Sequence, residues 1–191
     1  EASKIELTKS KVNFYDFIEE TIELVKFASA KTHLELIVKI DPKLNGHAYF
    51  DQVRLRQVLI NLLSNAFKFT DVGEIILSLS LINKVGNQAE IRFSVKDTGI
   101  GIPHAEIERL FKAFIQVNHS LSTNYGGTGL GLAISQALIE KMGGEIKIDS
   151  EIDEGSEFYF TLKFDFEEVD ELGESFDQIE KCLIIEDNQT A

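Results

Sequence analysis

The chain has 191 residues, of which 43% are hydrophobic and 27% charged, so it suits one soluble globular domain with a sizeable core. Its formal net charge of −13 argues against nucleic acid and anionic membrane surfaces as partners, because both attract basic patches. The single cysteine, Cys182, excludes an internal disulfide and favours a reducing, cytoplasmic compartment, and no apolar run approaches the roughly 20 residues of a membrane helix.

The first ten residues are predicted to be the end of a helix that begins upstream. The chain starts with neither Met nor a signal peptide, and we interpret it as a piece of a longer protein. Asn13 is expected to cap the next helix, whose apolar face begins at Phe14. Residues 33–40 alternate in polarity as a strand does, and Asp41-Pro42 ends that strand.

Residues 54–70 are predicted to form an amphipathic helix that Asp51 caps. Its apolar positions recur at spacings of three and four: Leu55, Val58, Leu59, Leu62, Leu63 and Ala66. Its polar positions form a second stripe: Arg54, Gln57, Asn61, Asn65 and Lys68. A solvated face is the simpler interpretation, but asparagine is a mediocre residue inside helices. Amide oxygens can bind a hard cation and an ammonium can contact phosphate, so the stripe predicts half of a metal–phosphate site.

The second half of the chain alternates between predicted strands and glycine-rich segments. Strands are expected at 74–82 and 90–96, joined by a hairpin turn at 85–87, and a short helix carrying Ile107 is expected after Pro103. Residues 115–125 are polar and predicted to be a loop. The glycine-rich segment 126–132 should open a further helix, in which these residues face inward: Leu130, Ala133, Ile134, Ala137, Leu138 and Met142. Strands at 145–150 and 157–164 precede an acidic linker at 166–180.

Two glycine-rich motifs carry the chemistry. In GGTGLGL, residues 126–132, glycines open a helix, so that backbone amides and the helix N-terminus can approach phosphate. A polar loop precedes this motif, which argues against a dinucleotide fold, and no G-x-x-x-x-G-K-[ST] motif is present. In DTGIGI, residues 97–102, a carboxylate at the end of a strand can accept a hydrogen bond from an exocyclic amine. A plain Asp-Thr-Gly turn is the alternative.

The asparagine helix and both glycine motifs, in this order, closely resemble the catalytic ATP-binding domain of sensor histidine kinases. Gyrase B, the heat-shock 90 chaperones and MutL share that fold. By resemblance, the N box is 61–68, the G1 box 97–101, the F box 110–114 and the G2 box 127–131, and the last glycine box contains Gly155, Ser156 and Phe158. The resemblance implies an α/β (α+β) two-layer sandwich for residues 11–165, with a mixed, mostly antiparallel sheet packed on helices and an ATP lid at 115–125.

The resemblance also implies a role for each site residue. Asn65 would hold Mg²⁺, Asn61 would support the metal or the triphosphate, and Lys68 would contact a phosphate. Asp97 would accept from the adenine amine, with Ser156 close by. The other expected nucleotide contacts are Phe69, Gly99, Gly101, Ile102, Thr128, Gly129, Leu130, Gly131 and Leu132.

The residue at position 61 separates two activities of this fold. Related ATPases usually carry a glutamate there as general base for water, whereas the amide of Asn61 cannot take a proton near neutral pH. Transfer of the γ-phosphoryl group of ATP to a histidine is therefore expected, since such catalysis is mostly positioning and charge neutralisation. No histidine of this chain lies in the family's acceptor context: His33, His47, His104 and His119.

The resemblance implies two partner domains in a two-component phosphorelay. The acceptor histidine belongs to a dimerisation domain upstream, in the same protein or in its dimer partner. Residues 181–191, with Glu186 and Asp187, resemble the start of a receiver domain, which predicts a hybrid sensor kinase, whether or not it is membrane-anchored. The lid holds Thr123 and Asn124 where many relatives carry basic residues, so a non-catalytic nucleotide-sensing or docking module remains an alternative. A chaperone-like or repair-type ATPase is weakened by Asn61.

Overall fold

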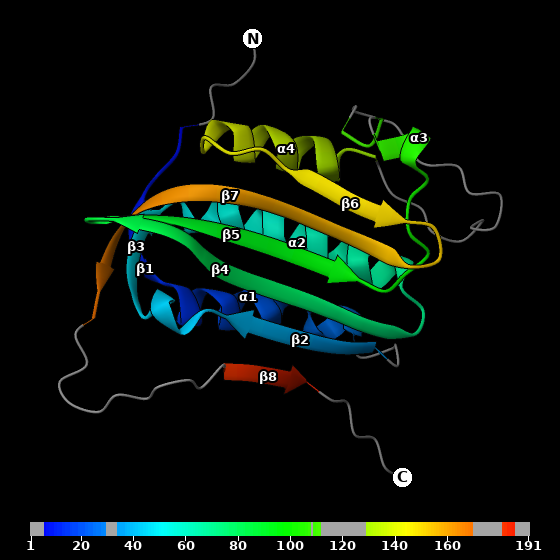
Figure 1. The fold of residues 1–191 in the computed structure, drawn as a ribbon, viewed down its shortest axis with the longest axis horizontal. Helices are drawn as coiled ribbons and strands as arrows, with labels where there is room; N and C mark the ends of the chain where they lie inside the picture. Colours follow the sequence, from blue (N-terminus) through cyan, green and yellow to red (C-terminus); the bar gives the residue numbers. More distant parts are fainter. Residues whose placement is uncertain (1–5, 30–33, 108, 112–128, 170–180, 186–191) are drawn as a thin grey trace.

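The molecule has two layers, a curved sheet and a set of helices on one of its faces (Figure 1). The computed structural model describes residues 6–29, 34–107, 109–111, 129–169 and 181–185. The helices are α1 (Phe14–Ser29), α2 (Gln52–Phe69), α3 (His104–Ile107) and α4 (Gly131–Lys141), with a 3₁₀ turn, η1, at Pro42–Leu44. The strands are β1 (Ser10–Asn13), β2 (Leu34–Ile40), β3 (Gly46–Phe50), β4 (Gly73–Val85), β5 (Gln88–Asp97), β6 (Lys147–Glu151), β7 (Gly155–Glu168) and β8 (Lys181–Ile185).

The sheet is mixed and mostly antiparallel, which confirms the predicted fold class. Its strand order is β1-β3-β7-β5-β4-β2-β8, and β6 pairs with β7 off this path. Only β2 and β4 run parallel among the described pairs, and the connection between them contains α2. Strand β7 pairs with β5 along one edge, and with β6 and β3 along the other. The register places Asp97, at the end of β5, opposite Ser156, at the start of β7.

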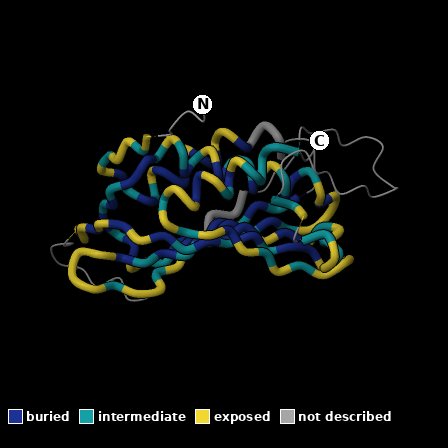
Figure 2. Tube along the Cα trace, turned by 90° about the horizontal axis from the view of Figure 1, so that it is seen from above, coloured by how far each residue is buried: buried dark blue, intermediate teal, exposed yellow. Residues whose placement is uncertain are grey.

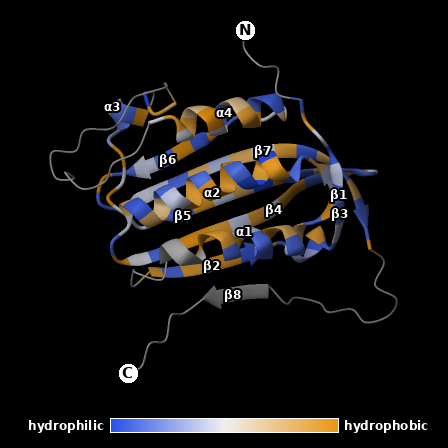
Figure 3. Cartoon of the chain, turned by 180° about the vertical axis from the view of Figure 1, so that it is seen from behind, coloured by the Kyte–Doolittle hydropathy of each residue, from blue (hydrophilic) through white to orange (hydrophobic). Residues whose placement is uncertain are grey.

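The core lies between the sheet and the helices. Figure 2 shows the helices on one side of the sheet with the buried segments between the layers, and Figure 3 shows α1, α2 and α4 from the helix side. All six predicted apolar positions of α2 are buried, which confirms its amphipathic pattern. Stacked aromatic rings fill the core below, with centroids 5.5 Å apart for Phe14 and Phe50 and 5.2 Å apart for Phe93 and Phe160. The packed sheet therefore gives α2 a rigid base.

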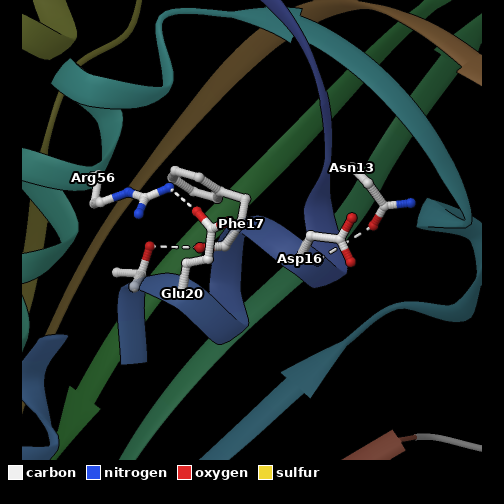
Figure 4. Close-up of polar contacts among 6 residues, drawn as sticks. Asn13, Asp16, Phe17, Glu20 and Arg56 are labelled. Atoms are coloured by element: carbon white, nitrogen blue, oxygen red, sulfur yellow. Dashed lines mark hydrogen bonds and ion pairs between the residues drawn. The ribbon is translucent and has the colours of Figure 1, made fainter. Parts of the chain in front are cut away.

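Helix α1 begins where Asn13 predicts, because the side-chain oxygen of Asn13 accepts a hydrogen bond from the backbone N–H of Tyr15. It also accepts one from the N–H of Asp16, which Figure 4 shows. The same view shows how α1 is held to α2. Arg56 on α2 forms a 2.6 Å ion pair with Glu20, and its guanidinium lies 5.4 Å from the ring centroid of Phe17. The polar face of α2 therefore also takes part in helix packing.

Several element boundaries differ from the sequence prediction. Strand β3 was not predicted, because five residues containing a glycine and a histidine give a weak strand pattern. In the described part of the N-terminal segment, Glu6–Lys9 forms no helix, and Ser10 already begins β1. Strand β7 reaches Glu168 with Phe166 only 1% exposed, so the predicted linker begins too early. Residues 170–180 lie outside the described residues, and β8 pairs with β2 at the sheet edge. No described helix combines the length and apolar character needed to cross a bilayer.

Asp51 joins the N-terminal segment to α2. One carboxylate oxygen accepts from the backbone N–H of Arg54 at 3.0 Å as the predicted helix cap, and the other accepts from the N–H of Thr8 at 2.9 Å. We expect Asp51→Ala to lower the free energy of unfolding by about 2 kcal/mol, because it removes a cap and leaves two partly buried N–H donors without their acceptor. Chemical denaturation measures this loss. Asp51→Asn keeps one acceptor and should lose about half as much; equal losses would contradict the two-acceptor explanation.

Candidate nucleotide-binding site

Four of the predicted site residues, Asn61, Asn65, Lys68 and Phe69, lie on α2. Asn61 and Asn65 are half-buried on the helix, one turn apart, and Lys68 follows in the last turn with its ammonium 4.9 Å from the ring centroid of Phe69. From Asn61 to Phe69 the helix advances about 12 Å. The two ends of the polar stripe therefore lie beside different parts of the chain: Asn61 beside α4, and Phe69 beside the DTGIGI segment.

Asn61 is held against the start of α4. Its side-chain N–H donates to the hydroxyl of Ser135 at 3.0 Å, and a Cβ atom on Gly131 would lie only 2.2 Å from its side-chain oxygen. The glycine at the opening of α4 is thus required for this close approach. Asn61, Gly131 and Ser135 line part of an open groove of about 800 Å³ between α1, α2 and α4. At these residues the structure brings the N box and the G2 box into contact.

Among the described residues, no side chain caps the opening of α4. Gly129 adopts a positive φ of 67°, and Leu130, at the N-cap position, makes no side-chain capping bond. The first N–H groups of a helix have no partner within the helix, so an uncapped start favours an anion there. Leu132 is half-buried and packs against the core. Thr128 and the predicted lid at 115–125 lie outside the described residues.

Asp97 is the buried carboxylate of the site. It lies at the end of β5 and is 5% exposed, and its Oδ1 accepts from the backbone N–H of Gly99 at 2.9 Å. Burial raises the pKa of Asp97 above its ordinary value, and the backbone N–H groups of Gly99 and Ser156 partly oppose this shift. Backbone N–H groups therefore hold the carboxylate in place, and it can still accept further hydrogen bonds.

Glycines let three segments meet around Asp97. A Cβ atom on Gly155 would lie 2.0 Å from the backbone oxygen of Asp97, and one on Gly99 would lie 2.2 Å from that of Phe69. The carbonyl of Phe69 accepts from the N–H of Ile100 at 3.2 Å. The end of α2, the DTGIGI segment and the start of β7 thus pack backbone to backbone, as the two glycine boxes require.

Sequence reasoning missed two serines that organise the site. The Ser150 hydroxyl lies 2.9 Å from that of Ser156 and accepts from the N–H of Ile102 at 2.8 Å, so it joins the last glycine box to the G1 box. Ser135 is 2% exposed on α4, whereas the predicted inward residues Ile134 and Ala137 are exposed. That part of the α4 prediction was wrong, because leucines and isoleucines occur around the whole helix and hide its buried face.

Gly131→Ala tests the contact between α2 and α4. A methyl group at this position must displace the amide of Asn61 from Ser135, and we expect a nucleotide affinity about tenfold lower. Thermal stability should change little, since alanine favours the helix by about 1 kcal/mol and offsets part of the clash. Calorimetric titration with a non-hydrolysable ATP analogue measures the affinity. Ala137→Ser, at an exposed position of the same helix, should bind as the wild type does; equal affinities for Gly131→Ala would contradict the contact.

Comparison with known proteins agrees with this geometry. Residues 50–166 match the family model described as histidine kinase-, DNA gyrase B-, and HSP90-like ATPase. The chain is 44% identical over 163 residues to the sensor protein GacS of Pseudomonas syringae pv. syringae, a match that covers 85% of this chain and 18% of GacS. It is 36% identical over 165 residues to the signal transduction histidine-protein kinase BarA of Escherichia coli K12, which covers 86% of this chain and 18% of BarA.

A solved structure supports the same assignment. Full-length ShkA in complex with AMPPNP superposes with a TM-score of 0.75 and is 33% identical in sequence, over 88% of this chain and 34% of ShkA. The matched family model covers more than half of this chain and includes α2, the DTGIGI segment, α4 and nearly all of β7. The chain is a member of the histidine kinase-, DNA gyrase B- and HSP90-like ATPase family.

Proposed function

We propose that this chain is the catalytic domain of a hybrid sensor histidine kinase, which binds Mg-ATP and transfers the γ-phosphoryl group to a histidine outside the chain. The observation that carries the proposal is the position of α2 between two nucleotide-binding segments. Its middle contacts the opening of α4 through Asn61, and its end contacts the Asp97 segment through Phe69. A phosphate-binding segment and the segment with the base-binding carboxylate thus both pack against α2.

Each side chain has a defined part in this proposal. Asp97 accepts a hydrogen bond from the adenine amine, and the uncapped N–H groups at the start of α4 bind phosphate oxygens. Asn65 offers an amide oxygen to Mg²⁺, a ligand type that this ion accepts together with phosphate oxygens and water. Lys68 contacts a phosphate as a point charge. Bound Mg²⁺ would neutralise phosphate charge as the γ-phosphoryl group is transferred.

Asn61 favours transfer to a histidine over hydrolysis. Its amide has no basic atom that could take a proton from water, and its N–H is already used on Ser135. In the proposed reaction the imidazole nitrogen displaces ADP, so that the phosphorus–oxygen bond to ADP breaks as a phosphorus–nitrogen bond forms. The chain supplies position and charge, while the nucleophile comes with the partner domain.

The partner domains are also part of the proposal. The chain spans about a fifth of the length of GacS and BarA, which are named as a sensor protein and a histidine-protein kinase. We expect a dimerisation and phosphoacceptor domain before residue 11 and a receiver domain after the acidic segment. Residues 181–185, its expected first strand, pair with β2 of the catalytic domain in this structure. The acidic segment 166–180, which starts as the end of β7, would connect the catalytic and receiver domains.

Two measurements test this function. Calorimetric titration of the chain with AMPPNP should show binding that Mg²⁺ strengthens. The Asn65→Ala variant should lose this binding. A protein extended to include the upstream domain should then label its own histidine with γ-labelled ATP. Binding without any labelling would instead support a nucleotide-sensing or docking module. Steady ATP hydrolysis by this chain alone would support an ATPase.

A further inference from the structure

Strand β8 adds to an edge of the sheet through one neighbour. It lies at the end of the strand order, where it pairs antiparallel with β2 from Leu36, opposite Ile185, to Ile40, opposite Lys181. Figures 1 and 3 show it beyond β2, on the outer side of the sheet edge. Among the described elements, β2 is the only one with which β8 makes more than marginal contact. A single antiparallel ladder therefore holds β8 on the domain.

Without β8, strand β2 would end the described sheet as a regular and open edge. It pairs with β4 over all seven of its residues without a shift in register, and it contains no proline. At the opposite end of the sheet, β1 is only four residues long. Short edge strands, bulges and prolines hinder the addition of a further strand, whereas a long, regular and apolar edge favours it. Of the two ends of the described sheet, β2 is therefore the one suited to accept a strand.

The sequence of β8 is not that of an edge strand. Residues 182–185 are apolar at every position, whereas β2 places the charged residues Glu35 and Lys39 between its buried ones. A continuous apolar run is typical of a strand that is buried on both faces inside a parallel sheet. Such a strand pairs along both of its edges, so it cannot pair with β2 at the same time. The position of β8 on β2 is therefore one of two alternative pairings.

We propose that the edge of β2 is a docking site for residues 181–185, and that the downstream domain competes with β2 for them. This inference rests on the proposed function, in which these residues begin a receiver domain. In this chain, its own strand occupies the edge. When a complete downstream domain takes the strand into its own sheet, the edge of β2 opens and can bind one extended segment through backbone hydrogen bonds. The folding of one domain thus controls a binding surface on its neighbour.

Proline substitutions in β8 test the docking. Successive N–H groups of a strand point to opposite sides, so only one of Cys182→Pro and Leu183→Pro removes an N–H that faces β2. We expect that variant to speed hydrogen exchange at the amides of β2 that face β8 by at least about tenfold, and to leave the amides that face β4 unchanged. The other variant should exchange as the wild type does. Ile184→Pro should behave like Cys182→Pro, because their N–H groups point to the same side.

A protein extended through the complete downstream domain tests the competition. Its β2 amides on the β8 side should exchange at least about tenfold faster than those of this chain, since the downstream sheet then holds the strand. Adding a synthetic peptide of residues 179–187 should restore their protection. The same peptide with proline in place of the residue whose N–H faces β2 should have no effect.

Three results would overturn the proposal. Equal exchange in all three proline variants, whether fast or slow, would contradict the ladder with β2. Protection of β2 that persists in the extended protein would show that the downstream domain does not compete. Protection that falls when this chain is diluted would assign the docked strand to a second copy. The kinase function is measured separately: an extended protein that binds ATP and labels its histidine but keeps β2 protected would refute this inference alone.

Discussion

Replacing Asp97 by asparagine is expected to lower the affinity for ATP by about a hundredfold while raising the stability of the unliganded chain at neutral pH. The affinity falls because the hydrogen bond from the adenine amine loses its charged acceptor, and such a bond is worth about 3 kcal/mol when desolvated. In addition, the amide N–H of the new asparagine can face the adenine amine, and two donors form no hydrogen bond. The gain in stability follows from the burial of Asp97, which raises its pKa and so disfavours the charged form in the folded state. The side-chain oxygen of the substituted asparagine would still accept from the N–H of Gly99.

The pH dependence distinguishes this explanation from a general loss of structure. A carboxyl group whose pKa is raised on folding contributes stability that is present below its ordinary value of 3.8 and is lost as pH rises through the folded pKa. The stability advantage of Asp97→Asn should therefore be largest near pH 7 and shrink as the pH falls toward 3.8. Denaturation at several pH values measures it. Asp153→Asn, at an exposed turn, should match the wild type; a destabilised Asp97→Asn chain at pH 7 would contradict the argument.

Gly101→Ala should destabilise the fold more than any other substitution considered for this site. Gly101 has a φ of 67°, and a Cβ atom there would lie 1.9 Å from the carbonyl oxygen of Glu151. Because that neighbour is backbone on β6, relief requires the G1 segment and β6 to separate. We expect a loss of at least about 3 kcal/mol, or a melting temperature lower by about 6 °C or more.

Gly86→Ala is the matched control for this effect. Gly86 lies in the turn between β4 and β5 with a φ of 58°, close to that of Gly101, but no described residue lies within 4 Å of its added Cβ atom. Alanine there should cost only the conformational strain of about 1 kcal/mol, which lowers the melting temperature by about 2–4 °C. Thermal melts of both variants separate the strain from the clash. Equal shifts would mean that the contact with Glu151 contributes nothing.

Prediction from sequence succeeded where the signal is local. Asn13 and Asp51 were identified as helix caps because a short polar side chain before an apolar repeat is a local pattern. The hairpin turn at Gly86 and most strands followed from turn residues and alternation. The end of β7 was missed because acidic residues on its exposed face, such as Glu167, dominate the composition. Phe166 on the other face is buried and continues the strand.

By itself, the sequence determined the motifs of the site and the helix that connects them, because hydrophobic periodicity and glycine spacing are local patterns that can be recognised without a structure. Tertiary structure alone decided which atoms meet. The contacts of Asn61 with Ser135 and of Ile102 with Ser150 join residues that lie far apart along the chain, so their spacing predicts no contact. Burial is the physical reason, since a serine or threonine hydroxyl acquires a specific partner only when packing removes it from water.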